Sequence, residues 1–204
     1  MNGRSVFVRA PGPTENLRIG LLGGSFNPAH EGHLHLSRVA LARLRLDYVW
    51  WLVSPQNPLK PGEGMADFAA RLAHAREVAR HPRVIATGIE DAIGTRYTID
   101  TIARLKRRFP RAHFVWLMGS DNLVQIPLWR RWKEIFCALP AAVVTRPGSA
   151  LSGRVGKAAR RLPLYSGDAV FASRRPPALA ILEARRSPIS GTAIRAAGAR
   201  TMAG

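Results

Sequence analysis

A glycine-rich turn between an apolar run and a helical pattern is the feature that most limits how this chain can fold. The segment Gly23–His33 (GGSFNPAHEGH) follows the apolar run Ile19–Leu22 and precedes helical periodicity over Leu34–Leu46. Glycine lets backbone N–H groups approach a ligand closely, and a helix N-terminus carries partial positive charge. A strand, a tight turn and a helix start in this order are typical of a phosphate-binding loop.

Two histidines, His30 and His33, stand at the end of this segment with Gly32 between them. The plain alternative is a tight turn followed by an Asn-Pro turn, with two incidental surface histidines. The glycine turn, the histidine spacing and the strand–helix context coincide, however. Their coincidence favours a phosphate site with both histidines beside it.

Short apolar runs alternate with helical patterns along the chain. Leu17–Leu22 and Tyr48–Val53 predict strands, and Gly32–Leu46 between them predicts a helix. This is a β-α-β unit, which implies parallel strands and a right-handed crossover. Further strands are predicted at Val84–Thr87, Phe114–Met118, Ala141–Thr145 and Leu179–Leu182, and helices at Asp67–Arg80, Ile99–Phe109 and Asn122–Cys137. The alternation predicts an α/β fold, a doubly wound and mostly parallel sheet with helices on both faces.

The length of 204 residues predicts one domain, residues 17–204, after a polar leader at 1–16 that we expect to be disordered. No apolar stretch approaches the roughly 20 residues of a membrane helix, so no membrane partner is expected. The single cysteine, Cys137, excludes an internal disulfide framework and a cysteine-based metal site. We expect it to pack in the core, and the reducing cytoplasm to be the compartment.

The formal net charge of +18 fits either nucleic-acid binding or attraction of anionic nucleotides. The arginines are spread along the whole chain, and the longest basic clusters, at 104–108 and 130–131, are short. This distribution favours a solvated basic surface, so no nucleic-acid partner is expected. An RNA-binding protein on an α/β scaffold is the alternative from another class. It would show steeply salt-dependent RNA binding without turnover.

Polar loops follow several of the predicted strands. The histidine segment follows the first strand, residues 54–60 the second, and Gly119–Asn122 the strand Phe114–Met118. Parallel strands end at one edge of a sheet, and ligands bind outside that edge. We therefore expect these loops to converge on one site.

The segment Ile189–Arg195 (ISGTAIR), taken with the histidine segment, resembles the nucleotidyltransferase superfamily that carries a His-x-Gly-His motif and a C-terminal Ser/Thr-rich motif ending in arginine. Within it the match is closest to bacterial nicotinate-nucleotide adenylyltransferases, and it covers residues 17–197 in family order. The supporting segments are RYTIDT (96–101), MGSDNL (118–123), IPLW (126–129) and TRPG (145–148). Asn27 stands where the family usually has aspartate, and Gly191 where it often has serine.

The resemblance implies a Rossmann-like nucleotidyltransferase fold and transfer of AMP from ATP to nicotinate mononucleotide. The products are deamido-NAD and pyrophosphate, in NAD biosynthesis, and Mg²⁺ accompanies ATP. The attacking phosphate monoester has a second pKa of about 6 and is ionised near neutrality, so no general base is required. The difficulty is to bring two polyanions together, since like charges about 4 Å apart repel by about 4 kcal/mol at an effective dielectric of 20. Catalysis is then expected to rest on positioning and charge neutralisation.

His30 and His33 suit this reaction as donors to ATP phosphates, and the resemblance implies the same role. It also implies that Arg195 clamps the pyrophosphate leaving group, so that these three residues are the predicted catalytic set. The predicted ATP-binding residues are Gly23, Gly24, Ser25, Phe26, Gly119, Asp121, Ser190, Thr192 and Arg195. The predicted mononucleotide-binding residues are Asn57, Lys60, Tyr97, Thr98 and Trp129. No residue is predicted to hold a metal.

The identity of the acceptor depends on Tyr97, Thr98 and Trp129. In the family the residue matching Trp129 stacks on nicotinate, whereas Trp50, Trp51, Trp116 and Trp132 are expected in the core. Transfer to nicotinamide mononucleotide or to phosphopantetheine is the alternative within the superfamily. The Tyr97 and Trp129 segments speak against phosphopantetheine. The choice between nicotinate and nicotinamide mononucleotide stays open, because it depends on whether donors or acceptors face the ring substituent and sequence does not show this. Monomer and homo-oligomer are both left open.

Overall fold

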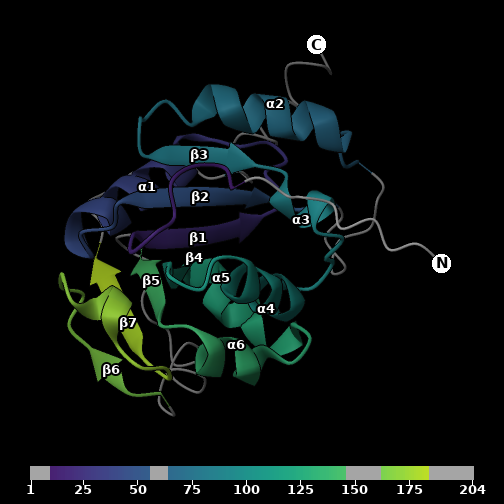
Figure 1. The fold of residues 1–204 in the computed structure, drawn as a ribbon. Helices are drawn as coiled ribbons and strands as arrows, with labels where there is room; N and C mark the ends of the chain where they lie inside the picture. The colour runs from purple at the N-terminus through teal and green to yellow at the C-terminus, as the bar shows by residue number, and fades with distance from the viewer. Residues whose placement is uncertain (1–9, 56–63, 146–161, 184–204) are drawn as a thin grey trace.

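Seven parallel strands form a single sheet at the centre of the computed structural model (Figure 1), which describes residues 10–55, 64–145 and 162–183. The sheet order is β3-β2-β1-β4-β5-β7-β6. The strands are β1 (Arg18–Gly24), β2 (Tyr48–Val53), β3 (Val84–Thr87), β4 (His113–Gly119), β5 (Ala141–Thr145), β6 (Leu164–Tyr165) and β7 (Leu179–Glu183). All pairings between neighbours are parallel, as the β-α-β pattern predicts. Each longer strand lies within two residues of its predicted bounds.

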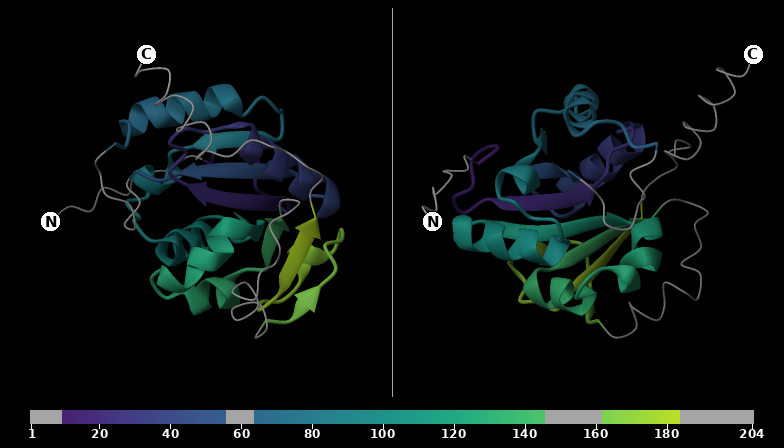
Figure 2. Two further views of the ribbon diagram at one scale, coloured as in Figure 1. Left: turned by 180° about the vertical axis from the view of Figure 1, so that it is seen from behind. Right: turned by 90° about the vertical axis from the view of Figure 1, so that its right-hand side faces the viewer.

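Helices cover both faces of this sheet, which confirms the predicted doubly wound fold (Figure 2). Residues of α1 (Glu31–Arg43) and α2 (Phe68–Val78) pack against one face. Residues of α3 (Ile89–Ala92), α4 (Thr98–Arg108) and α6 (Trp132–Ala138) pack against the other. The structure also contains α5 (Ser120–Gln125) and two single 3₁₀ turns, η1 (Ile126–Leu128) and η2 (Phe171–Ser173).

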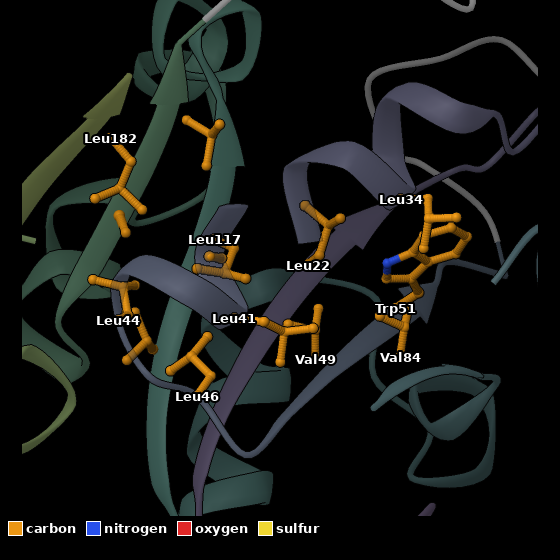
Figure 3. Close-up of a cluster of buried hydrophobic side chains, with 14 of the residues drawn as sticks. Leu22, Leu34, Leu41, Leu44, Leu46, Val49, Trp51, Val84, Leu117 and Leu182 are labelled. Atoms are coloured by element: carbon orange, nitrogen blue, oxygen red, sulfur yellow. The ribbon is translucent and has the colours of Figure 1, made fainter. Parts of the chain in front are cut away.

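The central strands read as continuous apolar runs because both of their faces are buried. Along β2, Trp50 and Trp51 point to opposite faces and both are fully buried. Trp116 on β4 is 1% exposed, so the prediction that the three strand tryptophans lie in the core is confirmed. Figure 3 shows Trp51 beside Leu34 of α1 in the cluster that joins this helix to the sheet.

The predicted helix at Asn122–Cys137 is wrong as a single element. The chain forms α5, then the turn η1, and begins α6 only at Trp132. Pro127 lies within η1, where it cannot donate the backbone hydrogen bond that a continuing helix needs. Arg131 then takes a left-handed conformation with φ 52°, which stops helical propagation.

Two core assignments need separate comment. Cys137, expected in the core, is exposed on α6, because its neighbours Ile135 and Phe136 occupy the buried face of this short helix. Trp132 is partly buried and packs against the core, with its ring 6.2 Å from that of Phe136. No helix in the described ranges is long and apolar enough to cross a bilayer.

The strand order reverses direction between β1 and β4. From β1 the chain moves outward through β2 to β3, and it then returns to β4 on the other side of β1. In open parallel sheets, ligands bind at this switch point, outside the carboxyl ends of the two strands. Here those ends are Gly24 and Gly119, which continue into the histidine segment and into α5.

Candidate active site

The histidine loop, residues 23–33, leaves the carboxyl end of β1 and leads into α1. Its first residue, Gly23, lies against the indole of Trp116 on the neighbouring strand β4. A Cβ atom placed on Gly23 would lie 2.6 Å from Cη2 of Trp116, so glycine is required for this close approach. The loop therefore begins with its backbone packed directly on the switch point of the sheet.

His30 and His33 lie side by side at the start of α1, with ring centroids 3.9 Å apart. His30 is the N-cap, and its Nδ1 accepts a hydrogen bond from the Gly32 N–H at 3.1 Å. Nδ1 of His33 accepts from the His30 N–H at 3.2 Å, which completes a capping box. Because Nδ1 is an acceptor in each ring, Nε2 carries the proton of each neutral imidazole. Both rings lie at the N-terminus of α1, which is the positive end of that helix.

Aromatic rings and a buried hydroxyl contact His33 on the side that faces the protein interior. Phe26 stacks on Trp51 with centroids 5.2 Å apart, and its ring lies 4.7 Å from that of His33. Ser37 accepts a hydrogen bond from the Trp51 indole at 2.8 Å and donates to the His33 carbonyl at 2.8 Å. Ser37 and Trp51 are fully buried, so the first two turns of α1 are fixed to β2.

Arg71 on α2 holds the histidine loop to the loop after β2. Its Nη1 donates to the carbonyl oxygens of Ser25 and Ser54, at 2.6 and 2.8 Å. Nη2 donates to Pro55 at 2.7 Å and Nε to Ala66 at 2.9 Å. The side chain is only 3% exposed, and desolvation lowers the pKa of the guanidinium below its usual value. A buried cation is tolerated here because backbone carbonyls surround it.

Sequence reasoning missed Arg71 because arginine is common throughout this chain. A signal was present nonetheless, since Arg71 lies four residues before Ala75, on the buried side of α2. A second missed contact involves Asn27, the residue that departs from the family pattern. Its side chain donates to the Gly64 carbonyl at 3.2 Å and accepts from the Ala66 N–H at 3.3 Å, so it braces the same pair of loops.

Gly119 and Asp121 lie beside the histidine loop, at the end of β4. Gly119 is the last residue of the strand, and Asp121 is exposed in the first turn of α5. A Cβ atom on Gly119 would meet only Leu36, at 3.9 Å, so packing does not require glycine there. The strand order thus brings these two predicted residues and the histidines to one edge of the sheet.

A second cluster, which we call the aromatic corner, consists of Tyr97, Thr98, Trp129 and Arg130. Tyr97 is the N-cap of α4 and Thr98 its first residue, and both are half-buried. The sequence pattern predicts a helix at Trp129, but the structure has this residue in extended backbone directly after η1. The Arg130 guanidinium lies 4.6 Å from the centroid of the Tyr97 ring, so the two predicted mononucleotide segments are in contact.

Trp116 connects the aromatic corner to the histidine loop. Its ring meets that of Trp129 in an edge-on arrangement with centroids 6.2 Å apart, and it also packs against Gly23. The two predicted binding regions are therefore separated by the width of one indole.

A buried carboxyl, Glu90, lies beneath the start of α4 and was not predicted. Its Oε1 accepts a hydrogen bond from Thr101 at 3.0 Å, and Thr101 also contacts the hydroxyl of Thr95 and the carbonyl of Tyr97. Burial raises the pKa of Glu90 to about 7, and the Thr101 hydrogen bond opposes that rise. The network fixes the short loop that ends at Tyr97. A buried acid gives no pattern that sequence reasoning can detect.

Five predicted site residues lie outside the described ranges. They are Asn57 and Lys60, which come between β2 and α2 in the sequence, and Ser190, Thr192 and Arg195 in the C-terminal motif. Their roles stay predictions from the sequence. Within the described ranges no group of three or more His, Cys, Asp or Glu side chains could hold a metal ion.

The sequence and fold were compared with known proteins. The family model described as cytidylyltransferase-like matches residues 21–197. A protein of Parvibaculum lavamentivorans named "Probable nicotinate-nucleotide adenylyltransferase" is 54% identical over 189 residues, which cover 91% of this chain and 94% of that protein. One of the same name from Cereibacter sphaeroides is 52% identical over 184 residues, covering 88% and 97%.

Among solved structures, Plasmodium falciparum nicotinic acid mononucleotide adenylyltransferase complexed with NaAD gives a TM-score of 0.62 at 15% identity. The match covers 86% of this chain and 78% of that one. The same enzyme complexed with APC gives a TM-score of 0.60 at 14% identity, covering 86% and 77%. At these identities the likeness is one of fold.

Proposed function

The chain belongs to the cytidylyltransferase-like family and, within it, to the nicotinate-nucleotide adenylyltransferases, and from this premise we propose how its residues carry the reaction. It is a nucleotidyltransferase of NAD biosynthesis that transfers AMP from ATP to nicotinate mononucleotide. The products are deamido-NAD and pyrophosphate. The observation that carries the proposal is the pair of backbone hydrogen bonds accepted by Nδ1 of His30 and of His33, from which we infer that Nε2 carries the proton.

The chemical step forms one bond and breaks one. A phosphate oxygen of nicotinate mononucleotide attacks the α-phosphorus of ATP, and the bond from that phosphorus to the oxygen bridging to the β-phosphorus breaks. The attacking monoester is already ionised near neutral pH, so no proton has to be removed. What the protein must supply is alignment of the two phosphates and compensation of their negative charge.

His30 and His33 supply hydrogen-bond donors in this scheme. Their Nε2–H groups and the backbone N–H groups of Gly24, Ser25 and Phe26 face the phosphates of ATP at the start of α1. Donors fixed before the reaction cost no reorganisation as charge develops, which makes such stabilisation effective. The Ser37–Trp51 contact and Arg71 support this fixation because they hold the loop from two sides. A histidine whose Nε2 is protonated is a donor and does not act as a general base.

The remaining predicted residues complete the site at its edges. Arg195 compensates the charge of the pyrophosphate leaving group, with Ser190 and Thr192 contacting ATP beside it. Gly119 lets ATP approach the end of β4, and Asp121 accepts a hydrogen bond from a ribose hydroxyl.

The acceptor occupies the aromatic corner and the loop after β2. The pyridine ring stacks on Trp129, and donors at Tyr97 and Thr98 meet its carboxylate. Lys60 and Asn57 contact the same mononucleotide. The Trp116 ring between Trp129 and Gly23 supports this placement, because it puts the two substrates within reach of each other.

Mg²⁺ enters as the complex with ATP. Magnesium in such sites is held by substrate phosphates and one or two carboxylates rather than by a protein cage. We propose that the phosphates of ATP supply most of its ligands, and we assign no residue of this chain to it. When bound, the ion neutralises phosphate charge. The compartment we propose is the cytoplasm.

Pyrophosphate release tests the function directly. The protein is incubated with Mg-ATP and nicotinate mononucleotide, and pyrophosphate and deamido-NAD are quantified. We expect both products in equal amounts, and less of the amide dinucleotide with nicotinamide mononucleotide. Absence of pyrophosphate with nicotinate mononucleotide would refute the proposal. Tight, salt-dependent RNA binding without turnover would favour the RNA-binding alternative.

A further inference from the structure

Arg130 and Arg131 are adjacent in the turn before α6, but their surroundings differ. Arg131 contacts both carboxylate oxygens of Glu134, at 2.8 and 2.5 Å, and lies 3.8 Å from Asp100 on α4. Its charge is therefore compensated twice. For Arg130, no carboxylate in the described part of the chain lies within salt-bridge distance. Its guanidinium rests on the face of Tyr97 instead.

The contact with Tyr97 places the charge of Arg130 at the acceptor site. Arg130 directly follows Trp129, and the ring on which its guanidinium lies belongs to the N-cap of α4. The ion pair between Arg131 and Asp100 ties the same turn to the first turn of α4. An exposed guanidinium is thus held on the Tyr97 ring, whose chain neighbour is Thr98, while Arg130 itself is the chain neighbour of Trp129. The positive end of α4 adds to its field.

We propose that Arg130 selects the acidic pyridine mononucleotide over its amide by binding the carboxylate on the ring. This inference rests on the proposed function, which places the pyridine ring on Trp129. A guanidinium donates only, in a planar fork that matches the two oxygens of a carboxylate. A carboxamide offers one oxygen and an NH₂ group, so it loses a hydrogen bond and the charge attraction. Stacking on Tyr97 orients the fork without neutralising it.

Two substitutions at Arg130 separate this role from mere packing. R130M keeps the length of the side chain and its contact with Tyr97 but removes the charge, and R130K keeps the charge without the planar fork. We expect R130M to lower kcat/KM for nicotinate mononucleotide by about 30-fold, mainly through KM, as loss of a charge-assisted hydrogen bond predicts. With nicotinamide mononucleotide the change is expected to stay within about twofold. R130K restores part of the preference.

Arg108 provides a matched control. Its guanidinium also lies over an aromatic ring, that of Phe109 at 5.4 Å, but at the far end of α4. R108M removes the same charge and the same kind of stacking, and we expect both kcat/KM values to stay at the wild-type level. If R130M lowers kcat/KM equally for acid and amide, the acid-to-amide ratio is unchanged. That result would show a structural role for Arg130 and would overturn the proposal.

Calorimetric titration with nicotinate mononucleotide distinguishes failure of this proposal from failure of the proposed function. If the wild-type protein binds the acid but releases no pyrophosphate, the reaction is refuted while R130M still reports on recognition. Weaker binding of the acid to R130M than to R108M supports the role of Arg130. Equal binding to the two variants contradicts it, whatever the assay shows.

Discussion

The histidine loop and the aromatic corner are built by different means. The histidine loop is held from inside the protein, by the hydroxyl of Ser37 and by a buried arginine bonded to four carbonyl oxygens. The aromatic corner rests on buried Trp116 and on the Glu90–Thr101 contact, but its own side chains are partly exposed and are joined by a stacked arginine and an exposed ion pair. The first arrangement fixes donors rigidly, which a transition state of concentrated charge requires. The second provides a face for binding. We propose that the chemical step depends on the more deeply buried of the two regions and acceptor recognition on the more exposed one.

Substitution of His33 gives the largest expected effect on the histidine loop. H33A removes one fixed donor, and we expect kcat to fall by about 100- to 1,000-fold, with a small change in KM for the mononucleotide. Steady-state release of pyrophosphate measures both constants. H113A, at an exposed histidine that opens β4, is the matched control and is expected to keep wild-type kcat. An unchanged kcat in H33A would remove this histidine from the mechanism.

Arg71 tests whether the histidine loop is held from inside. R71M leaves four carbonyl oxygens without this donor, so we expect the free energy of unfolding to fall by about 3 kcal/mol and Tm by about 10 °C. Because Ser25 loses its support, kcat is also expected to fall in the molecules that stay folded. Urea unfolding and kinetics measure the two effects. R76M, at an exposed arginine on α2, should change neither quantity, and similar stability of R71M and R76M would contradict the account.

Glu90 gives the aromatic corner a dependence on pH. Its folded pKa of about 7 exceeds the usual 4.5, so between these values the folded state holds a proton that the unfolded state has released. Its stabilising contribution is complete below pH 4.5 and is lost as the pH rises through 7. The loss amounts to about 3 kcal/mol. In E90Q we expect this part of the fall in stability between pH 5 and 8 to be absent.

Urea unfolding at pH 5 and pH 8 measures that difference. The comparison is between wild type and E90Q at each pH, because other groups titrate in both proteins. E77Q removes an exposed carboxyl from α2 and controls for the loss of a surface charge. If E90Q and wild type lose the same stability between the two pH values, the buried carboxyl of Glu90 does not control it.

Trp129 gives the smallest expected effect and acts on binding. W129A removes the face on which we propose that the pyridine ring stacks. We expect KM for the mononucleotide to rise about tenfold, since stacking on a base is worth about 1–3 kcal/mol. kcat is expected to change little. W132A removes another partly buried tryptophan of the same region and should leave KM unchanged. An effect of W129A confined to Tm would assign this residue to the core alone.

Sequence reasoning succeeded where the determinants are local. The histidine loop is one contiguous segment, and its turn, cap and helix start follow from the residues themselves. Alternating apolar runs predicted the order of strands and helices for the same reason. The break between α5 and α6 was missed although Pro127 is visible in the sequence, because the apolar periodicity continues across it.

Contacts between distant residues could not be predicted in this way. Arg71 lies 46 residues from Ser25, and nothing in the helix pattern names the carbonyl oxygens that it binds. Glu90 and Thr101 meet only because α3 and α4 fold against each other. The stacking of Arg130 on Tyr97 joins two segments that the sequence suggested separately. Tertiary packing, rather than local propensity, sets all three contacts.

The kcat/KM of the double variant H33A/W129A tests most directly whether the two regions serve one reaction by separate means. Independent contributions multiply, so the account predicts a loss of about 1,000- to 10,000-fold, the product of the two single losses. Each single variant is measured in the same assay with Mg-ATP and nicotinate mononucleotide. A double variant no slower than H33A alone would contradict the account, because Trp129 would then contribute nothing once the histidine donor is gone.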